Sequence, residues 1–150
     1  MPAANPANNA PLAWSGLVWS DVAQVGGAHD PLPAALLAEW VAGHLGGPDD
    51  VTLASRVARV VVCGNSRVAV ADHHLAAAKL SKEALERIHG PMNDLDALLS
   101  QMAAAAPVDV MPGATDPSGH WLPQQPMPAC VLPQASRFST LRRCANPHEC

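Results

Sequence analysis

The sequence predicts an α/β protein built on a layered, parallel sheet. Apolar and β-branched runs alternate with helical segments in the order strand, helix, strand, helix, strand, which is typical of parallel pairing. The run Val60–Cys63 is apolar at every position, as expected of a central strand buried on both faces. Two predicted strands end at Gly64-Asn65 and at Pro112-Gly113. Such steps are typical of the turn that leads from a strand into a loop.

The N-terminal half begins with small, polar and proline-rich residues at positions 1–11, which we expect to form a disordered tail. The first predicted strand lies in the short apolar run Leu12–Trp19. A helix is predicted over Pro33–Leu45, because leucine and valine recur there at every fourth position. Gly46-Gly47 should end this helix, and Pro48–Asp50 should complete the break.

The C-terminal half contains the second predicted strand, Val57–Cys63, and a second helix over Asp72–His89. Gly90-Pro91 should interrupt that helix, which restarts near Asn93 and runs to about Ala105. Pro107–Met111 is the third predicted strand. Beyond it we expect little regular structure except a helical turn around 134–139.

Composition excludes several classes of function. The chain has 150 residues, which suggests one domain at most. Its 9 Lys and Arg against 13 Asp and Glu give a net charge of -4, which argues against a nucleic-acid-binding surface. No apolar run is long enough to span a membrane. The four cysteines have no C-x-x-C spacing and follow no secretory signal, so an intracellular setting is expected.

Three strand-to-loop junctions are the candidate functional positions, at residues 15–18, 64–68 and 112–116. Ligands of α/β proteins bind at the carboxyl ends of strands. The residues alone leave a simpler alternative open, in which these junctions are tight turns that need glycine for backbone reasons.

The segment 107–126, PVDVMPGATDPSGHWLPQQP, resembles the P-V-D-V-M-P-G-x-x-D-P…L-P-Q-Q-P pattern of the small (B) subunit family of DNA polymerase delta. Segments 36–46, 56–65 and 139–147 resemble further stretches of that family in the same order. The resemblance runs from about Leu12 to the end of the chain. It implies a calcineurin-like phosphoesterase fold, to which the family adds an oligonucleotide-binding-fold domain.

The resemblance also implies that catalysis has been lost. Active members of that fold hold two metal ions in D-x-H, G-D-x-x-D and G-N-H-D/E motifs, since a dinuclear centre needs carboxylate, imidazole and amide ligands. The corresponding positions in this chain are Gly16, Val18, Asn65, Val68, Ala114, Thr115 and Asp116. Most of them have no suitable ligand atom, so we predict no catalytic residue, no bound metal and no cofactor.

The function implied by the resemblance is that of a non-catalytic scaffold subunit of a nuclear replicative polymerase. Its expected partners are the C-terminal domain of the catalytic subunit and a further accessory subunit, with DNA met only through the complex. Two alternatives stay open. One is a residual metal-dependent phosphoesterase, and the other is a truncated fragment with no independent function.

The chain is much shorter than the family pattern, so residues 12–150 are expected to form a partial phosphoesterase-like domain of marginal stability. Trp121 lies in a proline-rich stretch and is a possible interface anchor, because tryptophan is enriched at interface hot spots. Cys144, His148 and Cys150 match no common zinc-binding spacing, so the sequence predicts no zinc site there.

Overall fold

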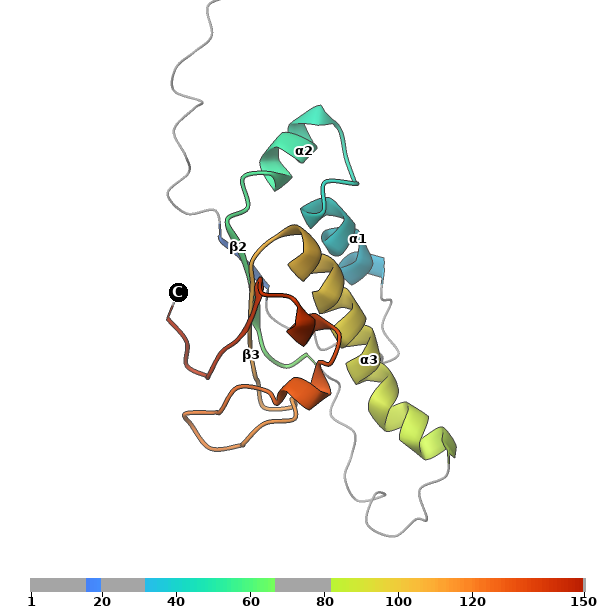
Figure 1. Cartoon of the computed structure of the whole chain (residues 1–150), viewed down its shortest axis with the longest axis vertical. Coiled ribbons are helices and arrows are strands. Elements are labelled where there is room, and N and C mark those ends of the chain that lie inside the picture. Colours follow the sequence, from blue (N-terminus) through green and yellow to red (C-terminus); the bar gives the residue numbers. More distant parts are fainter. Residues whose placement is uncertain (1–15, 20–31, 67–81, 150) are drawn as a thin grey trace, which may run out of the picture.

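The computed structural model describes residues 16–19, 32–66 and 82–149, with side chains described from 32 to 66 and from 89 to 149. Four strands form one sheet in the order β1-β2-β3-β4, and each neighbouring pair is parallel. These strands are β1 (Gly16–Trp19), β2 (Arg59–Cys63), β3 (Val108–Met111) and β4 (Leu141–Arg143). The predicted α/β class with parallel pairing is therefore confirmed (Figure 1).

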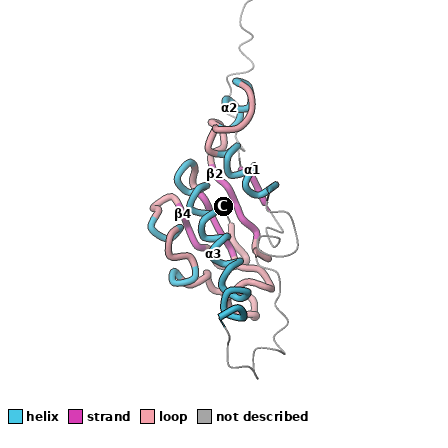
Figure 2. Tube along the Cα trace, turned by 90° about the vertical axis from the view of Figure 1, so that its right-hand side faces the viewer, coloured by secondary structure: helices cyan, strands magenta, loops and turns pink. Residues whose placement is uncertain are grey.

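One face of the sheet packs against helices α1 (Leu32–Val41) and α3 (Lys82–Ala105), which lie side by side in front of the strands in Figure 2. Alternate residues of β2 and β3 point toward this core. Its largest fully buried side chains come from α3, the two central strands and the irregular C-terminal segment: Leu95, Leu99, Met102, Met127, Leu132, Val60, Val62, Val108 and Val110. Burying each such leucine stabilises the fold by about 1.5–3 kcal/mol.

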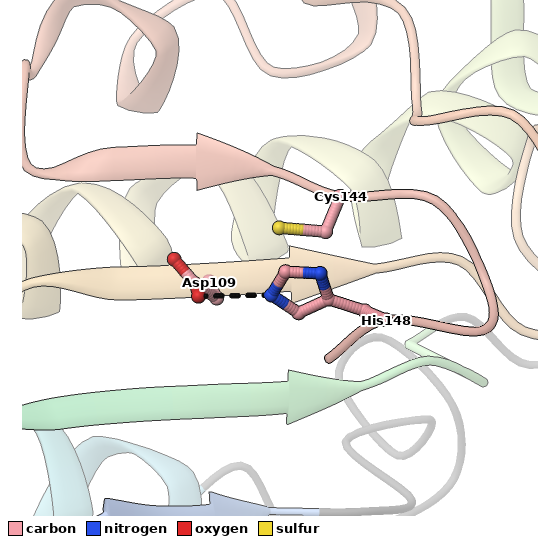
Figure 3. Close-up of side chains that lie close together, drawn as sticks. All are labelled: Asp109, Cys144 and His148. Atoms are coloured by element: carbon pink, nitrogen blue, oxygen red, sulfur yellow. Dashed lines mark hydrogen bonds and ion pairs between the residues drawn. The ribbon is translucent and has the colours of Figure 1, made fainter. Parts of the chain in front are cut away.

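The opposite face of the sheet carries the intervening residues, among them Val61 and Asp109, which are register partners on β2 and β3. Among the residues that the structure describes, this face meets the chain segment that follows β4, and the helices lie behind the sheet (Figure 3). The two faces therefore differ in polarity, because one packs against an apolar core and the other includes a buried carboxyl group.

Helix α2 (Pro48–Ala54) corrects the prediction that Pro48–Asp50 only completes a break. Pro48 begins the helix, where its missing N–H costs nothing. The Asp50 carboxylate accepts a hydrogen bond from the Gly47 N–H at 2.9 Å and so caps the first turn. The preceding helix is also shorter than predicted, ending at Val41 instead of Leu45.

Helix α3 corrects a second prediction, because it continues through Gly90-Pro91 without interruption. A proline inside a helix loses one backbone hydrogen bond and strains the preceding turn. The apolar stripe that includes Leu95, Leu99 and Met102 packs on the sheet and offsets this local cost.

The C-terminal segment is more regular than the sequence suggested. The predicted turn at 134–139 is present as the 3-10 helix η4 (Ala135–Arg137). A further 3-10 helix, η3 (Ala129–Val131), and strand β4 were not predicted. β4 is only three residues long, and its ladder with β3 starts where the Val108 N–H donates to the Thr140 carbonyl. So short a strand leaves little periodic signal in a sequence.

The first predicted strand, Leu12–Trp19, is present as β1 over Gly16–Trp19, and its residues 12–15 lie outside the described residues. The predicted disordered tail at 1–11 and most of the predicted helix over 72–89 lie outside them as well. The third predicted strand is confirmed as β3, and Val57–Cys63 is confirmed with a later start at Arg59. In the part of the chain with described coordinates, no helix is long and apolar enough to cross a membrane.

Candidate functional site

The carboxyl ends of β2 and β3 meet in two loops that pack backbone against backbone. Gly64 has a φ of +68°, and a Cβ there would lie 2.5 Å from the Gly113 nitrogen. A Cβ on Gly113 would lie only 2.2 Å from the Asn65 nitrogen. Glycine is therefore required at both positions by the close approach of the loops, and at Gly64 by its left-handed backbone as well.

Hydrogen bonds from polar side chains join these two loops. The Asp116 carboxylate accepts the Ser66 N–H at Oδ1 and the Gly113 N–H at Oδ2, both at 2.8 Å. The Asn65 Oδ1 accepts the Ala114 N–H at 2.9 Å. Asp116 is 3% exposed, so its charge is compensated by backbone N–H groups of the protein instead of by water.

A second pair of amide side chains extends the network toward the C-terminal segment. Gln124 donates to the carbonyls of Gly113 and Gly119 at 3.2 and 2.9 Å. Asn146 donates to the Pro112 carbonyl at 3.0 Å and to the Gln124 side-chain oxygen at 2.8 Å. The backbones of Gln124 and Asn146 also form an antiparallel bridge. The sequence did not single out either residue, because their partners lie far away along the chain.

The structure brings together only some of the predicted site positions. Asn65, Ala114 and Asp116 lie at the joined loops, and Thr115 lies between the last two. Gly16 and Val18 lie within strand β1, where they pair with Arg59 and Val61. Val68 lies outside the described residues. Thr115 and Ser66 each bury a side-chain hydroxyl that has no hydrogen-bond partner within the described part of the chain.

The chemistry available at the joined loops is limited. Across residues 32–66 and 89–149, one group of three His, Cys, Asp or Glu side chains lies close enough to share an ion, and it lies elsewhere, on the face of the sheet opposite α1 and α3. At the loops, the side-chain oxygens of Asp116 and Asn65 accept hydrogen bonds from backbone N–H groups. The arrangement therefore fixes loop geometry.

Trp121 lies in the loop between Asp116 and Gln124 and is 89% exposed, with its neighbour Leu122 exposed to 71%. The base of this loop is fixed by Gln124 and by a hydrogen bond from the Ser118 hydroxyl to the Gln125 carbonyl. An exposed tryptophan on an anchored loop is available to a partner, and its role as an interface anchor stays a prediction.

The group on the face opposite α1 and α3 consists of Asp109, Cys144 and His148, and Figure 3 shows them converging from β3 and from the segment after β4. Asp109 is 1% exposed; its Oδ1 accepts from Arg59 at 2.5 Å, and its Oδ2 lies 3.1 Å from His148 Nε2. In the sequence, the one sign of this group is a single acidic residue, Asp109, inside an apolar strand. A buried carboxylate needs charged partners, but the sequence pattern does not show which residues supply them.

Comparisons with known proteins agree with one another. The family model that describes the B subunit of DNA polymerase alpha/epsilon matches residues 20–150. The DNA polymerase delta small subunit of Oryza sativa subsp. japonica is 38% identical over 120 residues, covering 80% of this chain and 28% of that protein. The Arabidopsis thaliana protein of the same name is 39% identical over 123 residues, covering 79% and 27%. DNA polymerase delta subunit 2 of Drosophila melanogaster is 36% identical over 114 residues, covering 74% and 26%. The chain thus spans just over a quarter of the length of these relatives.

Proposed function

The chain belongs to the DNA polymerase delta small-subunit family, within the wider family of polymerase B subunits, and on this basis we propose that it acts as a non-catalytic accessory subunit in DNA replication. In this proposal it bridges the C-terminal domain of the catalytic subunit and a further accessory subunit in the nucleus. It meets DNA only through the complex. The family match supports the assignment to a polymerase. The bridging role is what the sequence resemblance to the small-subunit family implies.

The observation that most supports a non-catalytic role is the set of hydrogen bonds that the Asp116 carboxylate accepts. In the proposed calcineurin-like scaffold, this is the one acidic residue left at the positions where active enzymes hold two metal ions. Both of its carboxylate oxygens accept backbone N–H groups from the neighbouring loops. A carboxylate used in this way stabilises the protein's own loops, and its mapped neighbours Ala114 and Thr115 offer neither imidazole nor amide.

A binding experiment tests the accessory role. The full chain, carrying an affinity tag, is coexpressed with the catalytic subunit of its own polymerase and with the other accessory subunit. We expect both partners to be retained on the affinity resin after a wash at moderate salt. A matched sample in which the catalytic subunit lacks its C-terminal domain should lose the catalytic subunit. Failure to retain either partner, with a folded chain, would contradict the proposal.

The alternative function is a residual metal-dependent phosphoesterase. It rests on Asp116, the one acidic residue at the expected metal-binding positions. It predicts hydrolysis of a chromogenic phosphodiester in the presence of manganese. The accessory role predicts no turnover above the level of an Asp116→Ala variant. Turnover by the native chain that is abolished in Asp116→Ala would favour the enzyme. If neither turnover nor partner retention is found, the remaining alternative is a fragment with no function of its own.

A further inference from the structure

We propose that Asp109, Cys144 and His148 form a binding site for a zinc-type divalent ion on the face of the sheet opposite α1 and α3. One donor atom from each residue lies within 4.8 Å of the other two, and the three residues come from segments up to 39 positions apart. This inference is independent of the polymerase assignment. It concerns a face of the sheet different from the joined loops, and it uses none of the positions of the expected phosphoesterase motifs.

The donor set is appropriate for zinc. A thiolate sulfur, an imidazole nitrogen and a carboxylate oxygen are the three atom types that zinc binds in proteins, and the sulfur disfavours magnesium or calcium. All three side chains are withdrawn from solvent: Asp109 and Cys144 are 1% and 4% exposed, and the His148 side chain is 11% exposed. Cys144 is not part of a disulfide. Three protein ligands leave a fourth position for water or another ligand.

The spacing between Asp109 and His148 already matches a metal site. Two oxygen or nitrogen ligands on a tetrahedral zinc lie about 3.3 Å apart, given metal–ligand distances near 2.0–2.1 Å. The Asp109 Oδ2 and the His148 Nε2 are 3.1 Å apart. An ion can therefore replace the direct contact between them with very little separation of the two side chains. The Cys144 sulfur lies within 4.8 Å of both other donor atoms, against roughly 3.6 Å on a tetrahedral zinc, so the thiol completes the site by moving inward by at most about 1 Å.

Arg59 orients the carboxylate for this role. Its guanidinium binds Asp109 Oδ1 at 2.5 Å, and Oδ2 is the oxygen that faces His148. Carboxylates that bind metals are commonly held by a hydrogen bond to their second oxygen. Arg59 also limits the affinity, because its positive charge lies close to the ion. We therefore assign Arg59 as a positioning residue and the ion as a clamp that holds the segment after β4 against the sheet.

The test uses the full chain, prepared free of metal with a non-thiol reductant and titrated with Co²⁺ alone. We expect one equivalent to give the visible bands of tetrahedral cobalt and the near-ultraviolet charge-transfer band of a cobalt–thiolate bond. Zn²⁺ should then displace the cobalt and abolish both. Zn²⁺ should also raise the melting temperature of the chain in a concentration-dependent manner, as a ligand of the native state does.

Variants identify the ligands. Cys144→Ser should abolish the charge-transfer band, and His148→Ala should weaken Co²⁺ binding by at least about tenfold. The matched controls are Cys63→Ser, Cys130→Ser and His120→Ala, three changes outside the group of donors that should leave the spectrum unchanged. If the native chain gives no charge-transfer band, the proposal is wrong whatever the variants do. A band that survives Cys144→Ser would overturn it equally.

Discussion

At the scale of single residues, the described part of the chain uses its buried acidic groups to join segments that are distant in sequence. Asp116 joins the loops after β2 and β3 through two backbone N–H groups. Asp96 does the same for helix α3 and the C-terminal segment, accepting the N–H groups of Gln134 and Ala135 at 2.9 and 2.8 Å. Backbone donors that satisfy a buried carboxylate fix the path of a loop more strictly than apolar contact does.

Asp116→Asn should therefore destabilise the protein. The change replaces one accepting oxygen by an NH₂ group that faces a backbone N–H, so one buried donor loses its partner. We expect a loss of about 1–3 kcal/mol in the free energy of unfolding, measured by urea denaturation. The matched control is Asp94→Asn, an exposed position on α3, which should change stability by less than about 0.5 kcal/mol. Equal effects at the two positions would contradict the role assigned to Asp116.

Thr115→Val should behave in the opposite way. The Thr115 hydroxyl is buried and has no hydrogen-bond partner among the described residues, so its removal relieves an unpaired polar group at nearly constant volume. We expect urea denaturation to show unchanged or slightly higher stability. A loss of more than about 1 kcal/mol would mean that the hydroxyl has a partner in solution.

Residue-scale prediction from the sequence succeeded at two of three local motifs and failed where partners were remote. The junctions 64–68 and 112–116 were identified, because glycine and asparagine after a β-branched run mark a strand end. The predicted junction at 15–18 was wrong, because Gly16–Trp19 is strand β1. The partners of Asp109 were not identified. Arg59 lies 50 positions away and His148 lies 39 positions away, so no spacing rule connects them. Only the fold brings these charges together.

At the scale of elements, α3 shows how packing overrides local propensity. The sequence predicts a break at Gly90-Pro91, yet the helix is continuous from Lys82 to Ala105. Its C-terminal half is buried against the sheet at Leu95, Leu99 and Met102. Helix α2 shows the converse error, because its proline and aspartates are signals of a helix start that were interpreted as a break.

Gly90→Ala tests the surroundings of Gly90 within α3. Apart from its chain neighbours and the backbone of its own helix, a Cβ at Gly90 would have no atom within 4 Å, and alanine is favoured over glycine in a helix interior. The ring of Pro91 crowds a Cβ on the residue before it and offsets this gain. We therefore expect the free energy of unfolding to change by less than about 1 kcal/mol, measured by denaturation followed by circular dichroism. Gly64→Ala is the contrasting change. Its left-handed backbone and its contact with Gly113 should make it cost more than about 1 kcal/mol. A loss at Gly90 as large as the loss at Gly64 would contradict the open space around Gly90.

At the scale of the whole molecule, the two faces of the sheet differ, and the carboxyl ends of its parallel strands lie along one edge. Helices α1 and α3 cover one face, the buried Asp109 group lies on the other, and the joined loops occupy the edge. The parallel α/β class was predictable from the alternation of strands and helices. The calcineurin-like scaffold stays a prediction of the resemblance, as does the inactivity inferred from the positions of its metal-binding motifs.

Trp121→Ala tests which surface of the molecule meets a partner. The side chain is 89% exposed, so its loss should leave the unfolding free energy unchanged within about 0.5 kcal/mol. If the loop is an interface anchor, the affinity for a polymerase partner should fall by about tenfold or more, as measured by biolayer interferometry. Phe138→Ala, an exposed aromatic residue outside this loop at the end of η4, is the control and should bind normally. Unchanged binding by Trp121→Ala would exclude this loop from the interface.

We propose that this chain assembles into a polymerase delta complex as a non-catalytic component. The most direct measurement is the mass of the particle formed when the full chain is coexpressed with the catalytic and accessory subunits of its polymerase, determined by light scattering after size-exclusion chromatography. We expect a single species that contains one copy of each chain. A chain that is folded but elutes alone, while the other subunits assemble without it, would exclude membership of the complex.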